Sequence, residues 1–454
     1  MKTHLRNYFY ITCLLLLTFI QLNAQSRVIG YYADWLKDTL PVSKIKFEHL
    51  THINHAFAWP EEDGSLSMYQ NMLNPYLNSK AHENGVKMII SLGGWGNSYG
   101  FAAMAADSDA RSNFIENLVD FLNFYDYDGA DFDWEFPETS THKANFVKLI
   151  QELRTRFDEE NPEWVITMAV GISNWTGQWF DFNELKKSVD WFNVMCYDIH
   201  GNWSAHSGPN APLFQATGDV DGSITTAMTY LNVTRAIPKT QLNVGIPFYG
   251  KKFISAAFYT PFTGTVTDMR YSDIAPLVGN GWVYNWDNVC KVPYLKDNSN
   301  SMLITYDDTT SVRTKCEWIK EKGYSGAMIW ALGQDLIGEQ QLLLETIGKS
   351  LLQNTSPVVE KEEEIPATFY MEANYPNPFN PSTTIPFRLN ENANVVLSVY
   401  SVNGQEIASL INDYRVAGNY SVKFNASDHL SSGVYIVKLK TNRKTISRKI
   451  MLIR

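Results

Sequence analysis

Short hydrophobic runs recur at regular intervals along the first three quarters of the chain. Between several of them, amphipathic stretches with helical spacing occupy residues 108–125, 142–159, 223–235 and 311–322. The runs themselves are rich in β-branched and aromatic residues and predict eight strands, at residues 28–32, 52–58, 87–92, 129–134, 165–170, 191–197, 242–247 and 326–330. A repeated strand–helix order predicts a parallel sheet, and eight such units over residues 27–352 fit an α/β fold, the (β/α)8 TIM barrel.

Two regions depart from this rhythm. The stretch between the seventh predicted strand and the helix at 311–322 is too long for a structureless loop in a compact domain. We therefore expect a small α+β insertion at about residues 250–308, with a flexible loop as the alternative. Residues 353–366 form a Pro/Glu-rich linker, and residues 367–454 contain short alternating runs between Asn-Gly and Ser-Gly turns, which predict a small β-sandwich.

The amino-terminal residues have the pattern of a secretory signal peptide. A basic start precedes an apolar stretch at residues 11–20, and Leu22-Asn23-Ala24 forms a small-residue cleavage site. We expect residues 1–24 to be removed on export. The apolar stretch is too short for a stable membrane span.

Charge and cysteine content exclude several classes of protein. The formal net charge of −10 argues against a nucleic-acid surface, which needs clustered Lys and Arg. Residues 368–454 differ from the rest, with ten Lys or Arg against five Asp or Glu, and indicate a separate basic module. The cysteines after the signal peptide, Cys196, Cys290 and Cys316, fit neither a disulfide framework nor a zinc-binding spacing. We expect buried thiols, and a bridge between Cys290 and Cys316 stays open.

One predicted strand carries three acidic residues at alternate positions. It follows a turn signal and reads Asp128-Gly129-Ala130-Asp131-Phe132-Asp133-Trp134-Glu135. Because side chains alternate faces along a strand, Asp131, Asp133 and Glu135 share one face, and the two aromatic residues lie on the other. Acidic strand residues often form a solvated face, but the bulky aromatic residues favour acids that point into an enclosed space. Neighbouring buried carboxylates raise one another's pKa, so we expect one to hold a proton near neutral pH.

These acids favour acid–base chemistry over the other reactions that barrels support. No lysine at a strand end is placed for a Schiff base, and the His and Asp spacing offers no facial metal set, so we expect neither cofactor nor metal. A carboxylic acid beside a carboxylate suits protonation of a leaving oxygen, as in glycoside hydrolysis. Glu135, at the C-terminal end of the fourth predicted strand, extends far enough to be the donor. The residues alone identify no nucleophile.

The acidic strand resembles the D-G-x-D-x-D-W-E signature of glycoside hydrolase family 18, the chitinases and related endo-β-N-acetylglucosaminidases. Three further segments resemble family motifs on the third, sixth and eighth strands: Ser91-Leu92-Gly93-Gly94-Trp95, Met195-Cys196-Tyr197-Asp198-Ile199-His200-Gly201 and Gly326-Ala327-Met328-Ile329-Trp330. The resemblance covers about residues 27–352 and implies a glycoside hydrolase.

The resemblance also implies roles for individual residues. In this family the 2-acetamido oxygen of the substrate attacks the anomeric carbon, so no protein nucleophile is needed. Glu135 would protonate the glycosidic oxygen and later activate water. Asp133 would turn toward Glu135 or toward the acetamido N–H, and Asp131 would share its proton. Tyr197 would donate its hydroxyl to the acetamido oxygen, and the expected sugar-binding residues are Asp198, Met195, Trp330, Trp95, Tyr249, Trp203, Tyr31 and Phe57.

The residues around the acids bear on the choice of substrate. Trp95 and Trp203 follow strand ends and are expected to stack on successive sugars. Weaker candidates for stacking are Trp175, Trp179 and Trp282. The chain has Lys251 where chitinases often place Arg, which predicts a weaker or absent sugar contact, and Ala331 where some chitinases carry Glu.

Three functions stay open on the sequence. The resemblance favours an endo-acting chitinase that acts on chitin or chito-oligosaccharides. An endo-β-N-acetylglucosaminidase that releases N-glycans is the second reading. A non-catalytic chitin-binding lectin is the third, although such lectins usually lack the terminal acid, which is present here as Glu135.

The C-terminal region resembles the type A sorting domain of the Bacteroidetes type IX secretion system. The resemblance rests on Tyr375-Pro376-Asn377-Pro378-Phe379-Asn380-Pro381 and on Gly433-Val434-Tyr435. A carbohydrate-binding or fibronectin-like domain is the alternative. Together with the signal peptide, a sorting domain implies passage through the periplasm and then release or display at the cell surface. The type IX machinery would be a partner, and we expect the enzyme to be a monomer.

Overall fold

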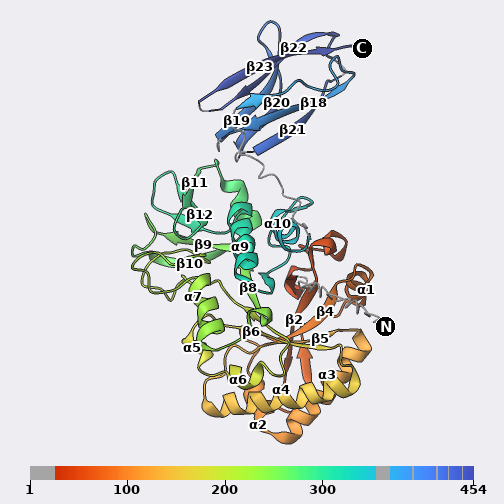
Figure 1. Cartoon of the computed structure of the whole chain (residues 1–454), viewed down its shortest axis with the longest axis vertical. Coiled ribbons are helices and arrows are strands. Elements are labelled where there is room, and N and C mark those ends of the chain that lie inside the picture. Colours follow the sequence, from red (N-terminus) through yellow and green to blue (C-terminus); the bar gives the residue numbers. More distant parts are fainter. Residues whose placement is uncertain (1–25, 354–368, 391–392, 416–417, 428, 442) are drawn as a thin grey trace, which may run out of the picture. The chain divides into compact units, whose positions relative to one another are not determined.

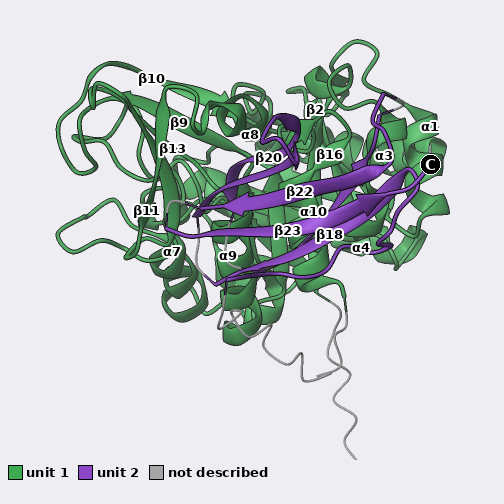
Figure 2. Cartoon of the chain, turned by 90° about the horizontal axis from the view of Figure 1, so that it is seen from above, with its two compact units in different colours: residues 1–354 green, residues 355–454 purple. Residues whose placement is uncertain are grey.

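The computed structural model describes residues 26–353, 369–390, 393–415, 418–427, 429–441 and 443–454. The expected signal peptide and all but the first residue of the expected linker lie outside these residues. Within the chain, two compact units separate, one up to residue 354 and one from residue 355 (Figure 2). None of the described helices combines the length and the apolar character needed to cross a membrane.

The first unit is built on a closed barrel of parallel strands (Figure 1). Closure is made by β1, which pairs with β2 on one side and β14 on the other; Ile29 is aligned with both His52 and Met328. The barrel strands, in chain order, are β1 (Arg27–Ala33), β2 (His52–Pro60), β4 (Lys87–Gly93), β5 (Gly129–Asp133), β6 (Val165–Val170), β7 (Trp191–Val194), β8 (Leu242–Pro247) and β14 (Gly326–Trp330). A short strand β3 (Leu66–Met68) pairs with the end of β2. The predicted (β/α)8 barrel is therefore confirmed, strand by strand.

Helices alternate with these strands along the chain. The predicted helices at residues 108–125, 142–159 and 311–322 are present, and each begins after a polar residue that caps it. In α3 the Asp107 carboxylate accepts hydrogen bonds from the N–H groups of Asp109 and Ala110, both at 2.9 Å. The predicted helix at 223–235 changes to a π-helix over its second half, Tyr230–Thr234. The helices of the unit are α1 (Pro75–Glu83), α2 (Phe101–Ala106), α3 (Ser108–Tyr125), α4 (Ser140–Glu160), α5 (Asn174–Gly177), α6 (Phe182–Leu185), α7 (Ile224–Thr229), α9 (Thr309–Lys322) and α10 (Leu342–Leu351).

The aromatic residues of β5 pack outward, as the strand pattern predicts. The Phe132 ring contacts Phe101 in α2, Phe114 in α3 and Phe146 in α4. Trp134 stacks on Phe101 at 5.3 Å between ring centroids. Because this face is filled by helices, the acids of β5 must point into the barrel.

The insertion after β8 is an antiparallel sheet with a short helix, as predicted. Its strands lie together beside the barrel (Figure 1), in the order β10-β9-β13-β12-β11. Its elements are β9 (Tyr249–Ile254), β10 (Thr263–Arg270), α8 (Tyr271–Ile274), β11 (Trp282–Asp287), β12 (Val292–Asp297) and β13 (Leu303–Thr305). A small hairpin of β15 (Leu336–Ile337) and β16 (Gln340–Gln341) follows β14.

The three cysteines within residues 26–353 are buried and unbridged. Cys196, Cys290 and Cys316 are free thiols, so the bridge that the sequence left open between Cys290 and Cys316 does not form. The Cys290 sulfur lies 3.1 Å from the Tyr259 hydroxyl instead.

The second unit consists of two antiparallel sheets around one core, which confirms the predicted β-sandwich. One sheet has the order β17-β18-β21 and the other β20-β19-β22-β23. Phe379, within the Pro/Asn-rich motif, is buried in this core, and its N–H donates to the Met451 carbonyl at 2.9 Å. The strands are β17 (Tyr370–Met371), β18 (Ser382–Leu389), β19 (Ala393–Ser401), β20 (Glu406–Arg415), β21 (Gly418–Asn425), β22 (Gly433–Lys440) and β23 (Thr445–Leu452).

Candidate active site

Three acids of the β5 segment, hereafter the acid row, lie at successive depths in the barrel. Asp131 is fully buried, Asp133 is buried, and Glu135 is half-buried just past the C-terminal end of the strand. The predicted shared face is therefore present, and it leads from the barrel interior toward the strand ends where barrel enzymes place their active sites.

Asp131 is saturated with hydrogen bonds. Its carboxylate accepts from Tyr31 Oη at 2.7 Å, Ser91 Oγ at 2.8 Å, Asn193 Nδ2 at 3.2 Å and the Thr167 hydroxyl. Burial raises the pKa of Asp131, and these four donors act in the opposite direction because they stabilise the charged form. The four donors fix the position of the Asp131 carboxyl group, and the net effect of burial and hydrogen bonds is a raised pKa.

Asp133 has the opposite surroundings. Its Oδ1 atom is buried without a hydrogen-bond partner, and in the described structure no hydrogen bond joins Asp133 to Asp131 or Glu135. Burial, then the charges of Glu135 and Asp131, raise the pKa of Asp133 well above its ordinary range. These surroundings favour the protonated form of the Asp133 carboxyl group.

Glu135 is poised to exchange a proton near neutral pH. Burial, and after it the charge of Asp198, raise the pKa of Glu135 to about 7. The backbone at this point is held by Ser98, whose hydroxyl accepts from the Glu135 N–H at 3.1 Å. The adjacent Phe136 ring contacts Trp175, an exposed tryptophan.

The glycine pair after β4 brings its backbone against the acid row. Gly93 and Gly94 both have left-handed φ angles, 106° and 81°. A Cβ on Gly93 would lie 2.4 Å from the Asp133 carbonyl oxygen, and the Gly94 N–H donates to that same oxygen at 2.8 Å. Only glycine fits this approach, which gives the S-x-G-G segment a physical reason.

Tyr197 lies just beyond β7 and faces the acid row. Burial, then the charges of Asp133, Asp198 and Glu135, raise the pKa of its hydroxyl well above 10, so the hydroxyl stays a donor. The nearest acceptor is the Met328 sulfur at 3.8 Å, a weak partner that a substrate oxygen can replace. Gly245 makes room for this residue, because a Cβ there would lie 3.0 Å from the Tyr197 ring.

Trp330 forms part of an aromatic cluster at the end of β14. Its ring stacks on Phe57 at 5.9 Å and lies 5.6 Å from Tyr31, while Met195 packs against the same group. Trp35 completes the cluster at 6.2 Å from both Trp330 and Phe57. Sequence reasoning missed Trp35, although its position directly after the first strand was the signal that singled out Trp95 and Trp203.

Asp198 is held by two neighbours on β9. The Tyr249 hydroxyl donates to its carboxylate at 2.6 Å, and the Lys251 ammonium lies 2.8 Å away. Lys251 is buried and also pairs with Asp268 at 2.7 Å. From the sequence, Lys251 was interpreted only as the replacement of an arginine. In the structure it positions Asp198. This contact depends on the fold of the insertion and could not be predicted from the motif.

The predicted stacking tryptophans differ in their surroundings. Trp203 is 63% exposed, and the Lys251 ammonium lies 5.2 Å from its ring, next to Asp198. Trp95 is 81% exposed and makes no ring contact with the described aromatic residues. Both rings are exposed to an external ligand. Of the two, Trp203 is the one linked to a predicted site residue, because Lys251 contacts both its ring and Asp198.

Taken together, these groups define an acid–base hydrolase. A carboxyl group with a pKa of about 7 can protonate a leaving oxygen and then take a proton from water. The same site contains Asp133 and Asp131, both with raised pKa values, the neutral hydroxyl of Tyr197 and an apolar cluster of aromatic rings.

Known proteins are similar to the chain in both units. Residues 27–335 match the family described as glycosyl hydrolases family 18, and residues 373–453 match the secretion system C-terminal sorting domain. The endochitinase of Manduca sexta is 30% identical over 407 residues, which are 78% of this chain and 72% of that protein. Chitinase A1 of Niallia circulans is 31% identical over 284 residues, 55% of this chain but only 41% of that longer protein.

Solved structures are similar over the first unit. An immunomodulatory active chitinase from Trichuris suis is 27% identical with a TM-score of 0.66, covering 72% of this chain and 100% of that chain. A family 18 N-acetylglucosaminidase from Paenibacillus barengoltzii has the same identity, TM-score and coverage. The chain belongs to glycoside hydrolase family 18 and carries a type IX sorting domain at its C-terminal end.

Proposed function

We propose that this protein is an exported, endo-acting chitinase that hydrolyses β-1,4 bonds between N-acetylglucosamine units. The observation that carries the proposal is Glu135, a half-buried carboxyl group with a pKa of about 7. Its charge raises the pKa of Asp133, whose Oδ1 atom is buried without a hydrogen-bond partner. Family membership supports hydrolysis of a glycosidic bond, and the names of the relatives support chitin as the substrate class.

The reaction would use the acetamido group of the substrate as the nucleophile. Glu135 protonates the glycosidic oxygen while the acetamido oxygen attacks the anomeric carbon and the bond to the leaving sugar breaks. Asp133 turns to hold the acetamido N–H, and the Tyr197 hydroxyl donates to the acetamido oxygen. Deprotonated Glu135 then activates a water molecule, which opens the oxazolinium ring and restores the acetamide with retained configuration.

Remaining residues would hold the distorted sugar. The cluster of Trp330, Phe57 and Tyr31 offers an apolar surface for the ring, and Asp198 is placed by Tyr249 and Lys251 to accept from a sugar hydroxyl. Exposed tryptophans lie near this centre on different elements: Trp35 on the aromatic cluster, Trp175 on Phe136 and Trp203 beside Lys251. Several separate stacking surfaces favour a chain of sugars over a single terminal residue.

Release of N-glycans by an endo-β-N-acetylglucosaminidase is the second candidate. It would use the same acid row and the same acetamide chemistry. The exposed tryptophans favour chitin, because flat, repeated stacking surfaces suit an unbranched polymer. A chitin-binding lectin would not need a glutamic acid tuned to a pKa of about 7.

Export is proposed from the C-terminal unit. A type IX sorting domain directs secretion in the systems that use one, and the expected signal peptide would first bring the chain to the periplasm. The enzyme would then act outside the cell or on its surface.

The test is the time course of products from a labelled N-acetylglucosamine hexamer. We expect internal cleavage, with dimers to tetramers among the first products and the β-anomer appearing first by NMR. A first product that is always one sugar would contradict endo action, and an inverted anomer would exclude the acetamide route. An N-glycoprotein is incubated in parallel, and release of its glycans would favour the endo-β-N-acetylglucosaminidase over the chitinase. The Glu135→Gln protein controls for contaminating activity.

A further inference from the structure

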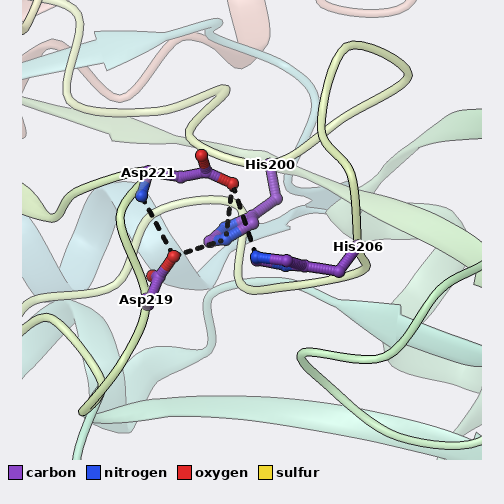
Figure 3. A group of neighbouring side chains, drawn as sticks. All are labelled: His200, His206, Asp219 and Asp221. Carbon is purple, nitrogen blue, oxygen red and sulfur yellow. Dashed lines mark hydrogen bonds and ion pairs between the residues drawn. The ribbon is translucent and has the colours of Figure 1, made fainter.

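Four side chains from the long segment between β7 and α7 converge away from the acid row. His200, His206, Asp219 and Asp221 point toward one another (Figure 3), and one potential ligand atom from each lies within 4.8 Å of the others. His200 is fully buried and Asp219 is 7% exposed, whereas His206 and Asp221 are half-buried. We call these four residues the His/Asp cluster.

The distances in the His/Asp cluster match those around a small divalent cation. His200 Nε2 lies 3.4 Å from Asp219 Oδ1 and 3.3 Å from Asp221 Oδ2. A tetrahedral Zn²⁺ with bonds of about 2.0–2.1 Å places neighbouring ligand atoms roughly 3.3 Å apart. His206 Nε2 is 4.0 Å from Asp221 Oδ2, which a small rotation of this half-buried ring would shorten.

Hydrogen bonds already orient both rings for a metal. His200 Nδ1 lies 2.8 Å from the Pro209 carbonyl oxygen, and His206 Nδ1 lies 3.2 Å from the Ser207 carbonyl oxygen. A carbonyl can only accept, so each Nδ1 carries the hydrogen and each Nε2 presents its lone pair to the cluster. Metal-binding histidines are usually fixed in this way.

The buried polar atoms of the cluster also lack adequate partners. His200 Nε2, Asp219 Oδ2 and Asp221 Oδ2 are buried and make no hydrogen bond. The His200 Nε2 atom is close to two carboxylates, but the alignment does not give a hydrogen bond to either. A buried and a half-buried carboxylate side by side are costly without a positive charge, and a metal ion bound by one atom of each residue would supply it.

We propose that the His/Asp cluster binds one divalent transition-metal ion of the Zn²⁺ class. Two imidazole nitrogens and two carboxylate oxygens are the donor set that Zn²⁺ accepts, whereas Ca²⁺ and Mg²⁺ prefer oxygen alone. The sequence predicted no metal, because the spacing of these residues matches no known motif and only the folded loop brings them together.

The bound metal would fasten the loop that carries substrate-binding residues. In the sequence, His200 follows Asp198 by two positions, and Trp203 stands between His200 and His206. The same loop is joined to the insertion, because the Ser207 N–H donates to the Thr260 carbonyl at 2.9 Å and Asn210 Nδ2 donates to the Tyr249 carbonyl at 3.2 Å. The metal is therefore structural, and it adds no step to hydrolysis.

The experiment measures metal in the full-length, tag-free protein. The protein is loaded with excess Zn²⁺, passed through a column in chelator-treated buffer and analysed by mass spectrometry for metals. We expect about one zinc per chain. His206→Gln and Asp221→Asn, at half-buried positions that tolerate change better than His200, should retain less than about a fifth of that amount.

The matched control is His82→Gln. His82 also lies between two carboxylates, 3.1 Å from Asp126 and 2.8 Å from Asp128, but the Lys87 ammonium, 2.6 Å from Asp128, already supplies the positive charge. This variant should keep its zinc. Zinc should also raise the melting temperature of the unaltered protein and of His82→Gln by a few degrees, and leave the two cluster variants unchanged.

A second measurement needs no variant. Co²⁺ bound in place of zinc should give the visible absorption of a tetrahedral site, and added Zn²⁺ should abolish it. The proposal is overturned if the unaltered protein keeps no zinc, if both cluster variants keep as much as the unaltered protein, or if Ca²⁺ stabilises the protein and Zn²⁺ does not. Hydrolysis is not the readout, so these outcomes are independent of the proposed chitinase activity.

Discussion

The acid row and the His/Asp cluster both bury carboxylates, but the two sites balance the charge differently. In the acid row no described Lys, Arg or His forms an ion pair with the buried carboxyl groups; Asp131 accepts four hydrogen bonds, and the pKa of Asp133 is raised. In the cluster, two histidines face the carboxylates and a metal is proposed between them. A raised pKa suits the proposed proton transfer in the acid row, whereas the proposed metal would fix the geometry of the cluster.

The largest expected effect is that of Glu135→Gln. The amide keeps the shape of the side chain but cannot supply a proton, so kcat should fall by roughly 10²–10⁴-fold while substrate binding is retained. Steady-state hydrolysis of chito-oligosaccharides would measure kcat, and calorimetry would measure substrate binding. An unchanged kcat would exclude Glu135 as the proton donor.

Tyr197→Phe should have the next largest effect. Loss of one donor to a developing charge typically costs on the order of 10²-fold in kcat, and KM should change little. Tyr69→Phe serves as the control, because Tyr69 is on the outer edge of the aromatic cluster and bonds to Asn97 instead. An effect on KM alone would mean that the Tyr197 hydroxyl acts only in binding.

The pH dependence should follow Glu135. Because the proton donor has a pKa of about 7, kcat/KM should fall about tenfold per pH unit above that value. Folding raises this pKa from 4.5, so the stability that the group contributes is full below about 4.5 and is lost as the pH rises to about 7. Thermal melts should therefore show Glu135→Gln stabilised relative to the unaltered protein at pH 8, with little difference at pH 4.

Lys251→Met should have a moderate effect. The change removes the ammonium that holds Asp198, and kcat/KM should fall roughly tenfold or less, since a partly exposed ion pair contributes about 1 kcal/mol. Lys252→Met, on the other face of the same strand, should leave kcat/KM unchanged. Equal losses in the two variants would assign the effect to the strand and not to Asp198.

The smallest effect on hydrolysis is expected in the cluster. His206→Gln should keep kcat within about twofold of the unaltered value while it lowers the melting temperature measured with Zn²⁺. A large loss of kcat with an unchanged melting temperature would show that the cluster serves hydrolysis and not stability.

Much of this architecture is predictable from the sequence because it depends on local periodicity. The eight barrel strands, the aromatic outer face of β5 and the position of the insertion follow from patterns a few residues long. The roles of Glu135 and Tyr197 came from motifs whose spacing is fixed by single strands. Trp35 and Lys251 were missed or undervalued because their significance depends on contacts with residues far away in the chain.

That Asp131 shares its proton stays a prediction, but the surroundings of Asp131 show the same limit. Period two places the three acids on one face, but the donors that saturate Asp131 come from β1, β4, β6 and β7. The pattern of one strand contains no information about the polar residues of the neighbouring strands, so these hydrogen bonds could not be predicted from it.

The sequence by itself determined the barrel, the row of acids and the sorting domain, since hydrophobic periodicity and contiguous motifs act over short distances. Only the tertiary structure decided which acid is held by four hydrogen bonds, what positions Asp198, and that His200, His206, Asp219 and Asp221 meet. Those outcomes depend on desolvation and on distances between atoms from separate segments, and both exist only once the chain has folded.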